Sequence, residues 1–199
     1  MKVIIVTGTP GTGKTTLSVK LAKKLDFHYI DVNEIVKGYG LSEGYDRKRK
    51  TQVIDVKKLN MALIKEISTI KKNSIKKYNS IINSNKKIKS HLNKKFDKNN
   101  SNINKKNNKK IKKGIIIDSH LAHYLPKRYV DLCIVAKCGL KTLKERLRRK
   151  KYSKEKVREN LDAEIFDICL NEAKETMHNI IVIDTTKGLN MRIISRKIR

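Results

Sequence analysis

A glycine-rich segment at residues 8–15 reads Gly-Thr-Pro-Gly-Thr-Gly-Lys-Thr, and it limits the fold more than any other part of the sequence. It matches the pattern G-x-x-x-x-G-K-[ST] of a phosphate-binding loop (P-loop) through Gly8, Gly13, Lys14 and Thr15. The glycines let backbone N–H groups turn toward phosphate oxygens, Lys14 supplies a positive charge and the Thr15 hydroxyl can ligate Mg²⁺. A chance glycine-rich turn would lack the flanking pattern, which here is a β-branched run before the loop and an amphipathic helical pattern after it. The segment therefore predicts binding of a nucleoside triphosphate.

The hydrophobic pattern predicts strands that alternate with helices. The expected strands are residues 3–6, 28–32, 115–118, 132–135 and 179–184, and the expected helices are residues 15–25, 56–70, 141–151 and 153–177, with Ser153 as N-cap, plus a short basic helix after Gly188. This alternation indicates an α/β fold, a P-loop NTPase-type parallel sheet of about five strands with helices on both faces. Ligands of such sheets bind beyond the C-terminal ends of the strands, where the P-loop and Asp118 would both lie. Residues 33–55 are expected to form a small mobile insert rather than core.

Residues 71–113 are a low-complexity Lys/Asn insertion. They contain 16 Lys and 11 Asn, no Arg and the single acid Asp97, so we expect them to be mostly disordered or loosely helical. Sixteen lysines against one aspartate contribute +15 to the formal net charge of +29 and leave +14 on the rest of the chain. Such a charge favours polyanionic partners, although a genome biased toward Lys and Asn would give the same composition.

Cysteine usage and hydropathy bear on the location of the chain. Cys133, Cys138 and Cys169 have no metal-ligand spacing and suit reduced thiols. No stretch approaches the ~20 apolar residues of a membrane span, and the N-terminus enters a strand at once, so no signal peptide is expected. The expected location is cytoplasmic, without a membrane partner.

Two later segments are candidates for chemistry. Asp118 ends a hydrophobic strand, where the second acid of a P-loop enzyme would lie near the metal, although an ordinary strand-end acid would look the same. His120 could orient water or a transferring phosphoryl group, but a lone histidine is more often structural, and His123 is a weaker candidate. The basic residues 144–158 form either a solvated face or a lid that closes over the triphosphate.

Together these segments resemble the isoenzyme-6-type adenylate kinases, small archaeal and eukaryotic nuclear P-loop kinases linked to small-subunit ribosome assembly. The resemblance spans nearly the whole chain apart from the insertion, and its matching segments are residues 7–16, 44–46, 117–120, 125–126, 145–147, 152–153, 156 and 164–166. It implies Mg²⁺-dependent phosphoryl transfer from ATP to AMP (ATP + AMP = 2 ADP), with some ATPase activity.

The resemblance also implies roles for segments and residues. Residues 31–54 would be the nucleoside-monophosphate (NMP) site and residues 149–159 the lid. The residues that would hold the ATP phosphates and Mg²⁺ are Gly11, Gly13, Lys14, Thr15 and Thr16. Asp118 and His120 would form the modified second-acid motif, so the implied catalytic residues are Lys14, Asp118 and His120, and the implied metal ligands are Thr15 and Asp118.

Three lysines complete the comparison with the family. Lys150 stands where the family has a basic lid residue that touches ATP, and Lys187 where it places a lysine near the adenine. Lys37 stands where the family often has Arg. Lys can neutralise a phosphate but cannot clamp it bidentately, so the acceptor contacts stay open, with Arg47 and Arg49 as candidate substitutes.

Three functions remain open from the sequence. The first is the adenylate kinase reaction. The second is an assembly factor in which ATP binding and hydrolysis switch contacts with a small-subunit ribosomal protein and rRNA, with little kinase turnover. The third is a kinase for another small acceptor, because P-loop kinases share these motifs.

Overall fold

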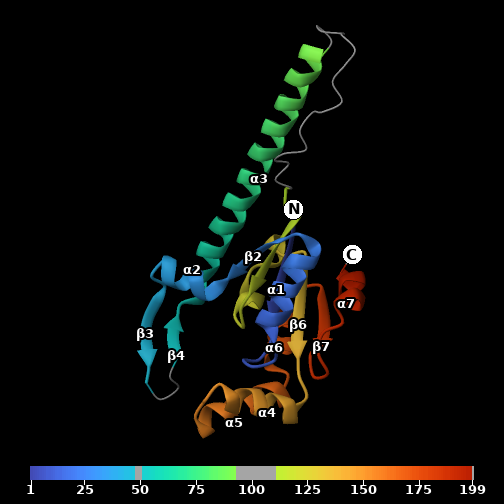
Figure 1. The fold of residues 1–199 in the computed structure, drawn as a ribbon. Coiled ribbons are helices and arrows are strands. Elements are labelled where there is room, and N and C mark those ends of the chain that lie inside the picture. The colour runs from blue at the N-terminus through green and yellow to red at the C-terminus, as the bar shows by residue number, and fades with distance from the viewer. Residues whose placement is uncertain (48–50, 93–110, 199) are drawn as a thin grey trace. The chain divides into compact units, whose positions relative to one another are not determined.

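The computed structural model describes residues 1–47, 51–92 and 111–198, with the backbone alone for residues 84–92. Over these residues, five strands form one parallel sheet in the spatial order β2-β5-β1-β6-β7 (Figure 1). The strands are β1 (Lys2–Thr7), β2 (His28–Asp31), β5 (Gly114–Asp118), β6 (Leu132–Lys137) and β7 (Ile180–Asp184). Every neighbouring pair is parallel, which confirms the predicted sheet.

The register of the sheet brings distant segments together at one edge. Val6 near the end of β1 pairs with Asp118 at the end of β5, and Thr7 pairs with Val135 of β6. The P-loop and the segment after Asp118 therefore leave the sheet from the same edge, where parallel α/β sheets bind ligands.

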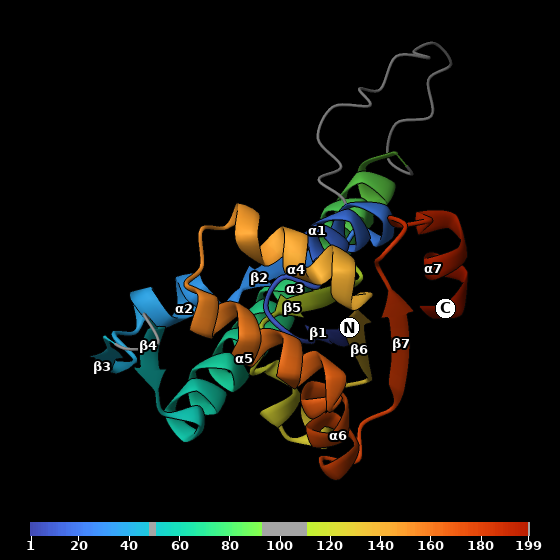
Figure 2. The ribbon, with the colours of Figure 1, turned by 90° about the horizontal axis from the view of Figure 1, so that it is seen from below.

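Helices cover both faces of this sheet (Figure 2). On one face, α1 (Lys14–Leu25) and α7 (Met191–Ile198) pack on alternate strand residues. The buried side chains of this layer include Ile4, Val6, Leu17, Leu21, Ile116, Ile134, Ile194 and Ile198. On the other face, α6 (Ile168–Glu175) contacts β6, and Ala173 of this helix is fully buried. The predicted C-terminal helix is confirmed as α7.

The segment expected to be a mobile insert has regular structure. It contains α2 (Val32–Gly38) and the antiparallel pair β3 (Ser42–Asp46) and β4 (Thr51–Ile54). Asp31 caps α2 by accepting a hydrogen bond from the Asn33 amide at 2.9 Å. The side chains of β3 and β4 are mostly exposed, in agreement with the expectation that residues 33–55 are not core. That expectation is wrong for α2, because its Val36 is buried.

Two helices, α5 (Lys154–Ile165) and α6, replace the single helix predicted over residues 153–177. They follow α4 (Leu140–Arg149). Ser153 caps α5 as predicted, since its hydroxyl accepts from the Lys156 amide at 3.2 Å. The break before α6 comes at Asp167, which has a left-handed φ of 54°. The apolar stripe continues across this break, so the sequence pattern did not reveal it.

The helix predicted over residues 56–70 is also longer than expected. It is α3 (Val56–Leu92), preceded by β4 and followed, beyond the described gap, by β5. Residues 71–92 contain no Gly or Pro, and Lys is a good helix former, so nothing ends the helix at residue 70. The expectation of disorder or loose helix is therefore corrected for residues 71–92, and the part of the insertion at residues 93–110 lies outside the described residues.

The chain divides into two compact units, of which one comprises Met1–Lys65 with Lys113–Arg199 and the other Glu66–Lys112. The sheet, its covering helices and every residue of the candidate site below belong to the first unit. The short 3₁₀ turns η1 (Ala122–Tyr124) and η2 (Lys127–Tyr129) connect β5 to β6. Among the described helices, none has both the length and the apolar character needed to cross a membrane.

Candidate active site

The P-loop joins β1 to α1 in a conformation that depends on glycine. Gly13 stands at the N-cap of α1 with φ 90°, and a Cβ on Gly8 would lie 2.3 Å from the carbonyl oxygen of Ala136. The first helical hydrogen bond of α1 runs from the Leu17 amide to the Gly13 carbonyl at 3.0 Å. The amides of residues 14–16 are the orphan donors of a helix N-terminus and are available to an anion.

Lys14 is held within this loop. Its Nζ donates a hydrogen bond to the Thr9 carbonyl at 3.0 Å. Burial lowers the pKa of Lys14 to about 8, although the nearby Asp118 carboxylate acts in the opposite direction. A phosphate would supply the negative charge that this buried ammonium lacks.

Asp118 faces the loop from the end of β5 and is 5% exposed. The Tyr29 hydroxyl donates to its Oδ2 at 3.2 Å, and the Thr15 hydroxyl is also hydrogen-bonded to this carboxylate. Burial raises the pKa of Asp118, while these hydrogen bonds and the Lys14 charge favour the ionised form. Asp118 thus meets Lys14 and Thr15, from which it is separated by about half of the chain.

His120 lies two residues beyond Asp118, and its side chain is exposed in the open cleft. Desolvation by the surrounding protein and the charge of Lys14 lower its pKa to about 4, which favours the neutral ring. A neutral imidazole can donate or accept a hydrogen bond but adds no charge. This suits a group that orients a water molecule or a phosphoryl oxygen.

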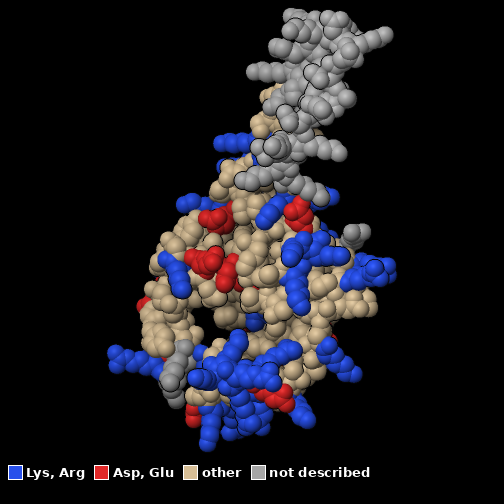
Figure 3. Space-filling view, viewed as in Figure 1, with Lys and Arg blue, Asp and Glu red and all other residues tan. Residues whose placement is uncertain are grey.

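A cleft of about 740 Å³ contains all these groups. Its lining residues are Pro10, Gly11, Gly13, Lys14, Thr15, Thr16, Lys20, Asn33, Thr51, Asp118, Ser119, His120, Arg146, Arg149, Lys150, Tyr152, Lys156, Thr185, Gly188 and Leu189. Six of them are Lys or Arg, against the single acid Asp118. Figure 3 shows Lys and Arg gathered along the rim of a hollow, over α4 and α5. The cleft is therefore strongly basic and fits a polyphosphate.

The corner between α4 and α5 forms one wall of this cleft. Arg146 of α4 is fixed by Thr185, to which it donates at 3.0 Å (Oγ1) and 2.8 Å (carbonyl oxygen). Thr185 in turn donates to the Thr12 carbonyl of the P-loop. The ammonium of Lys156, in the first turn of α5, lies 4.7 Å from the centre of the ring of Tyr152, which is in the connection between the helices. One wall of the cleft is thus bonded to the P-loop through Thr185.

Comparison with known proteins places this site in a family. Residues 4–167 match the model of an AAA domain family. An adenylate kinase isoenzyme 6 homolog of Schizosaccharomyces pombe is 31% identical over 181 residues, covering 91% of this chain and 79% of that protein. A candidate adenylate kinase of Methanocaldococcus jannaschii is 33% identical over 183 residues, covering 92% of this chain and 76% of that protein. The chain belongs to the adenylate kinase isoenzyme 6 family. It is thus a kinase enzyme with a P-loop nucleotide site.

The fold agrees with this assignment. The crystal structure of a sugar kinase from Janibacter superposes with a TM-score of 0.50 at 13% identity, covering 100% of this chain and 92% of that one. At this identity the likeness concerns the fold alone. The fold is thus shared with a kinase of different sequence.

Most residues expected at the site of this isoenzyme-6 family member meet in the cleft. Those that line it are Gly11, Gly13, Lys14, Thr15, Thr16, Asp118, His120 and Lys150. Lys187 does not line it, although its neighbour Gly188 does, and the Lys187 side chain is exposed. Lys37 is also exposed on α2 and outside the lining.

Several residues of this kinase site escaped the sequence analysis. Thr185 follows β7 directly, so its place at the carboxyl end of a strand was a usable signal. Tyr29 lies inside β2, and nothing in the sequence distinguishes it from a core aromatic residue. Asn33 and Thr51 line the cleft from the predicted NMP segment, whose residues 48–50, including Arg49, lie outside the described part.

The donor set suits Mg²⁺. Thr15 and Asp118 present a hydroxyl and a carboxylate that are hydrogen-bonded to each other, and both are oxygen ligands. Among the described residues, no group of three or more His, Cys, Asp or Glu side chains is arranged to hold a metal. Mg²⁺ is usually bound through one or two protein oxygens together with water and nucleotide phosphates, so Thr15 and Asp118 would be sufficient.

Proposed function

We propose that the protein catalyses Mg²⁺-dependent phosphoryl transfer from ATP to AMP, giving two ADP. The observation that carries this proposal is one basic cleft that joins the P-loop and Asp118 to Asn33 and Thr51 of the NMP segment. A donor and an acceptor nucleotide can therefore lie in the same cavity. The names of the relatives favour AMP as the acceptor.

The donor half would work by positioning and charge. The amides of residues 14–16 would bind the β-phosphate region, and Lys14 would neutralise the outer phosphates. Thr15 and Asp118 would hold Mg²⁺, which supplies further charge neutralisation when it is bound. Phosphoryl transfer depends mainly on such positioning and electrostatic stabilisation. The AMP phosphate is already negative, so the reaction needs no strong general base.

The lid in this proposal is residues 149–159, the end of α4, the connection and the start of α5. Arg149, Lys150 and Lys156 line the cleft from this side. Closure over the nucleotide would bring these charges onto the migrating phosphoryl group and exclude water. The acceptor phosphate would be bound by the NMP segment, residues 31–54.

The deciding assay measures ADP formation from ATP and Mg²⁺ with and without AMP. We expect AMP to raise the rate well above that of hydrolysis alone. The Lys14→Ala variant should lose both activities, since the phosphate charge would no longer be compensated, and remaining activity would reveal a contaminating kinase. If AMP adds nothing, the acceptor assignment is wrong, and CMP, UMP and small non-nucleotide acceptors should then be tried in the same assay.

The excess of basic charge favours a second candidate, an ATPase that assists maturation of the small ribosomal subunit. The formal net charge of +29 exceeds what one nucleotide site requires, and neutral His120 is suited to orient an attacking water. In this candidate, ATP hydrolysis would switch contacts with a small-subunit ribosomal protein and rRNA. It predicts AMP-independent hydrolysis, and binding to rRNA fragments that weakens steeply with salt. If ATP is consumed only when AMP is present, and the protein binds no RNA at low salt, the ATPase candidate is excluded.

A further inference from the structure

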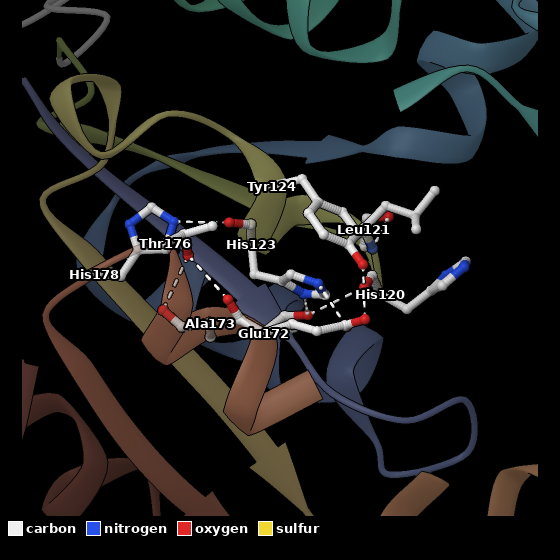
Figure 4. A network of polar contacts seen from close by, with 10 residues as sticks. His120, Leu121, His123, Tyr124, Glu172, Ala173, Thr176 and His178 are labelled. Atoms are coloured by element: carbon white, nitrogen blue, oxygen red, sulfur yellow. Dashed lines mark hydrogen bonds and ion pairs between the residues drawn. The ribbon is translucent and has the colours of Figure 1, made fainter. Parts of the chain in front are cut away.

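A buried histidine behind the cleft connects three parts of the chain. His123 of η1 is 1% exposed. Its Nδ1 lies 2.8 Å from the Thr7 hydroxyl, and its Nε2 lies 3.0 Å from Oε2 of Glu172 on α6. Figure 4 shows the ring of His123 directed toward Glu172, while the ring of His120 points away from this cluster.

Thr7 links His123 to the site. It is the last residue of β1, directly before the P-loop, and its hydroxyl also lies 3.3 Å from the carbonyl oxygen of His120. The Thr7 hydroxyl has one proton to share between these two acceptors. The protonation of Nδ1 of His123 therefore decides whether the Thr7 hydroxyl can donate a hydrogen bond to the His120 carbonyl.

The hydrogen-bond direction follows from Glu172. The Glu172 carboxylate lies at an ion-pair distance from Nε2, outside hydrogen-bond alignment, and its negative charge favours a proton on this nitrogen. Nδ1 of the neutral ring is then the acceptor for the Thr7 hydroxyl. Tyr124 donates to the other oxygen of Glu172 at 2.7 Å, which fixes this carboxylate. Burial lowers the pKa of His123, while Glu172 opposes this shift and the neighbouring His178 adds to it. The neutral ring with its proton on Nε2 is thus the favoured form.

The contacts of His123 lead from Thr7 on one side to α6 on the other, and α6 follows α4 and α5 in the chain. Glu172 belongs to α6, and α6 begins directly after α5 and the turn at Asp167. His178, which follows α6, contacts the His123 carbonyl through Nε2 at 2.9 Å. Two contacts therefore hold η1 against this part of the chain, one from Glu172 within α6 and one from His178 just after it.

We infer that His123 is a positioning residue that ties Thr7 and the loop carrying His120 to α6, so that the His120 imidazole stays directed into the phosphate cleft. The inference rests on the proposed phosphoryl transfer and deepens it. His123 acts only through Thr7, the backbone of residues 118–123 and Glu172.

The test compares variants that keep different halves of the ring. His123→Asn keeps a polar group near Nδ1, and His123→Gln keeps one near Nε2, while Thr7→Val removes the hydroxyl at nearly constant volume. We expect His123→Gln and Thr7→Val to lower kcat about tenfold, as misplacement of a group at the cleft does. The affinity for a fluorescent ATP analogue should change less than twofold, because the P-loop itself is retained.

A double-mutant cycle and a spectroscopic signal separate positioning from general destabilisation. Thr7→Val combined with His123→Gln should be no slower than the worse single variant, because both break the same chain of contacts. Edited ¹⁵N spectra of the histidine rings, with His120 assigned through His120→Asn, should show that the His120 signal moves in both variants. The control is Thr176→Val, which removes the hydrogen bonds to the Glu172 and Ala173 carbonyls at the end of α6 but leaves the Glu172 carboxylate and His123 in place. It should leave kcat and the His120 signal unchanged.

Additive losses in the cycle, or an unmoved His120 signal, would overturn the inference. So would a Thr176→Val variant as slow as His123→Gln, because the loss would then follow from loosening α6. Failure of the proposed function is visible separately, as wild-type protein without AMP-dependent turnover. In that case the His120 signal and the rate of ATP hydrolysis still test the role of His123.

Discussion

Lys14 lies in a place that disfavours its own charge. Its ammonium is buried and hydrogen-bonded to the Thr9 carbonyl, and Asp118 is the acid that supports it. With a pKa of about 8, part of the population is already uncharged at slightly alkaline pH. A bound polyphosphate favours the charged form and therefore raises this pKa. Nucleotide binding is thus linked to uptake of a proton.

We predict that ATP affinity falls as the pH rises through 8. Below pH 8 Lys14 is already charged. Above pH 8 the free energy of binding includes the cost of protonating Lys14, so the affinity at pH 9 should be about tenfold weaker than at pH 7. Calorimetry in buffers of different ionisation enthalpy should show proton uptake at pH 9. Lys14→Arg, which stays charged, should bind with little pH dependence. Constant wild-type affinity from pH 7 to 9 would show that Lys14 is not the linked group.

Gly11 makes a second residue-scale prediction. It has φ 93°, and a Cβ there would lie 2.8 Å from Leu147 and 2.9 Å from Leu143, both fully buried. Gly11→Ala should lower the free energy of unfolding by about 1–3 kcal/mol, through backbone strain and overpacking. Urea unfolding measures this. Gly38→Ala is the matched control, since nothing lies within 4 Å of its added methyl group, and a similar loss there would refute the packing argument.

At the scale of elements, the strands of the parallel sheet were readable from the sequence, whereas β3, β4 and the extents of two helices were not. Apolar runs predicted β1, β5, β6 and β7, since strands of a parallel sheet are rich in apolar residues, and β2 was predicted as a short strand despite its His and Asp ends. The continuation of α3 beyond residue 70 depends on the absence of a stop signal, and the break at Asp167 depends on one left-handed residue. Neither has a mark in hydrophobic periodicity. The contacts of His123 join residues 7, 123 and 172, so only the fold reveals them.

The connection between α4 and α5 gives a prediction that contrasts two lysines. Lys150 lines the cleft, and the side chain of Lys187 does not. Lys150→Ala should raise the KM for ATP about tenfold through loss of a charge at the phosphates, whereas Lys187→Ala should change it less than threefold. Steady-state kinetics with saturating AMP measures both. A larger effect at Lys187 would mean that lid closure brings it to the nucleotide, as the family resemblance implies.

At the scale of the whole molecule, the site and the insertion belong to different units. All residues that line the cleft lie in the unit of Met1–Lys65 and Lys113–Arg199. The start of α3 is part of this unit, with Leu59 and Leu63 fully buried. Lys113 is part of it too, because its amide donates to the Asp26 carbonyl at 3.1 Å and its carbonyl accepts from the Lys2 amide. A clean excision of the insertion must therefore stop at residue 112.

We predict that replacing residues 71–112 by a flexible linker of about ten Gly and Ser residues leaves kcat and KM within about threefold of wild type. The cleft keeps all its lining residues, and loop closure costs little over this range of lengths. The same kinetic assay and a thermal unfolding curve measure the outcome. The matched control replaces residues 71–112 by Gly/Ser of equal length, which removes the lysines but keeps the spacing. If the short linker is slow and the long one is not, geometry rather than charge accounts for the loss; if both are slow at unchanged stability, the Lys-rich segment itself contributes to turnover.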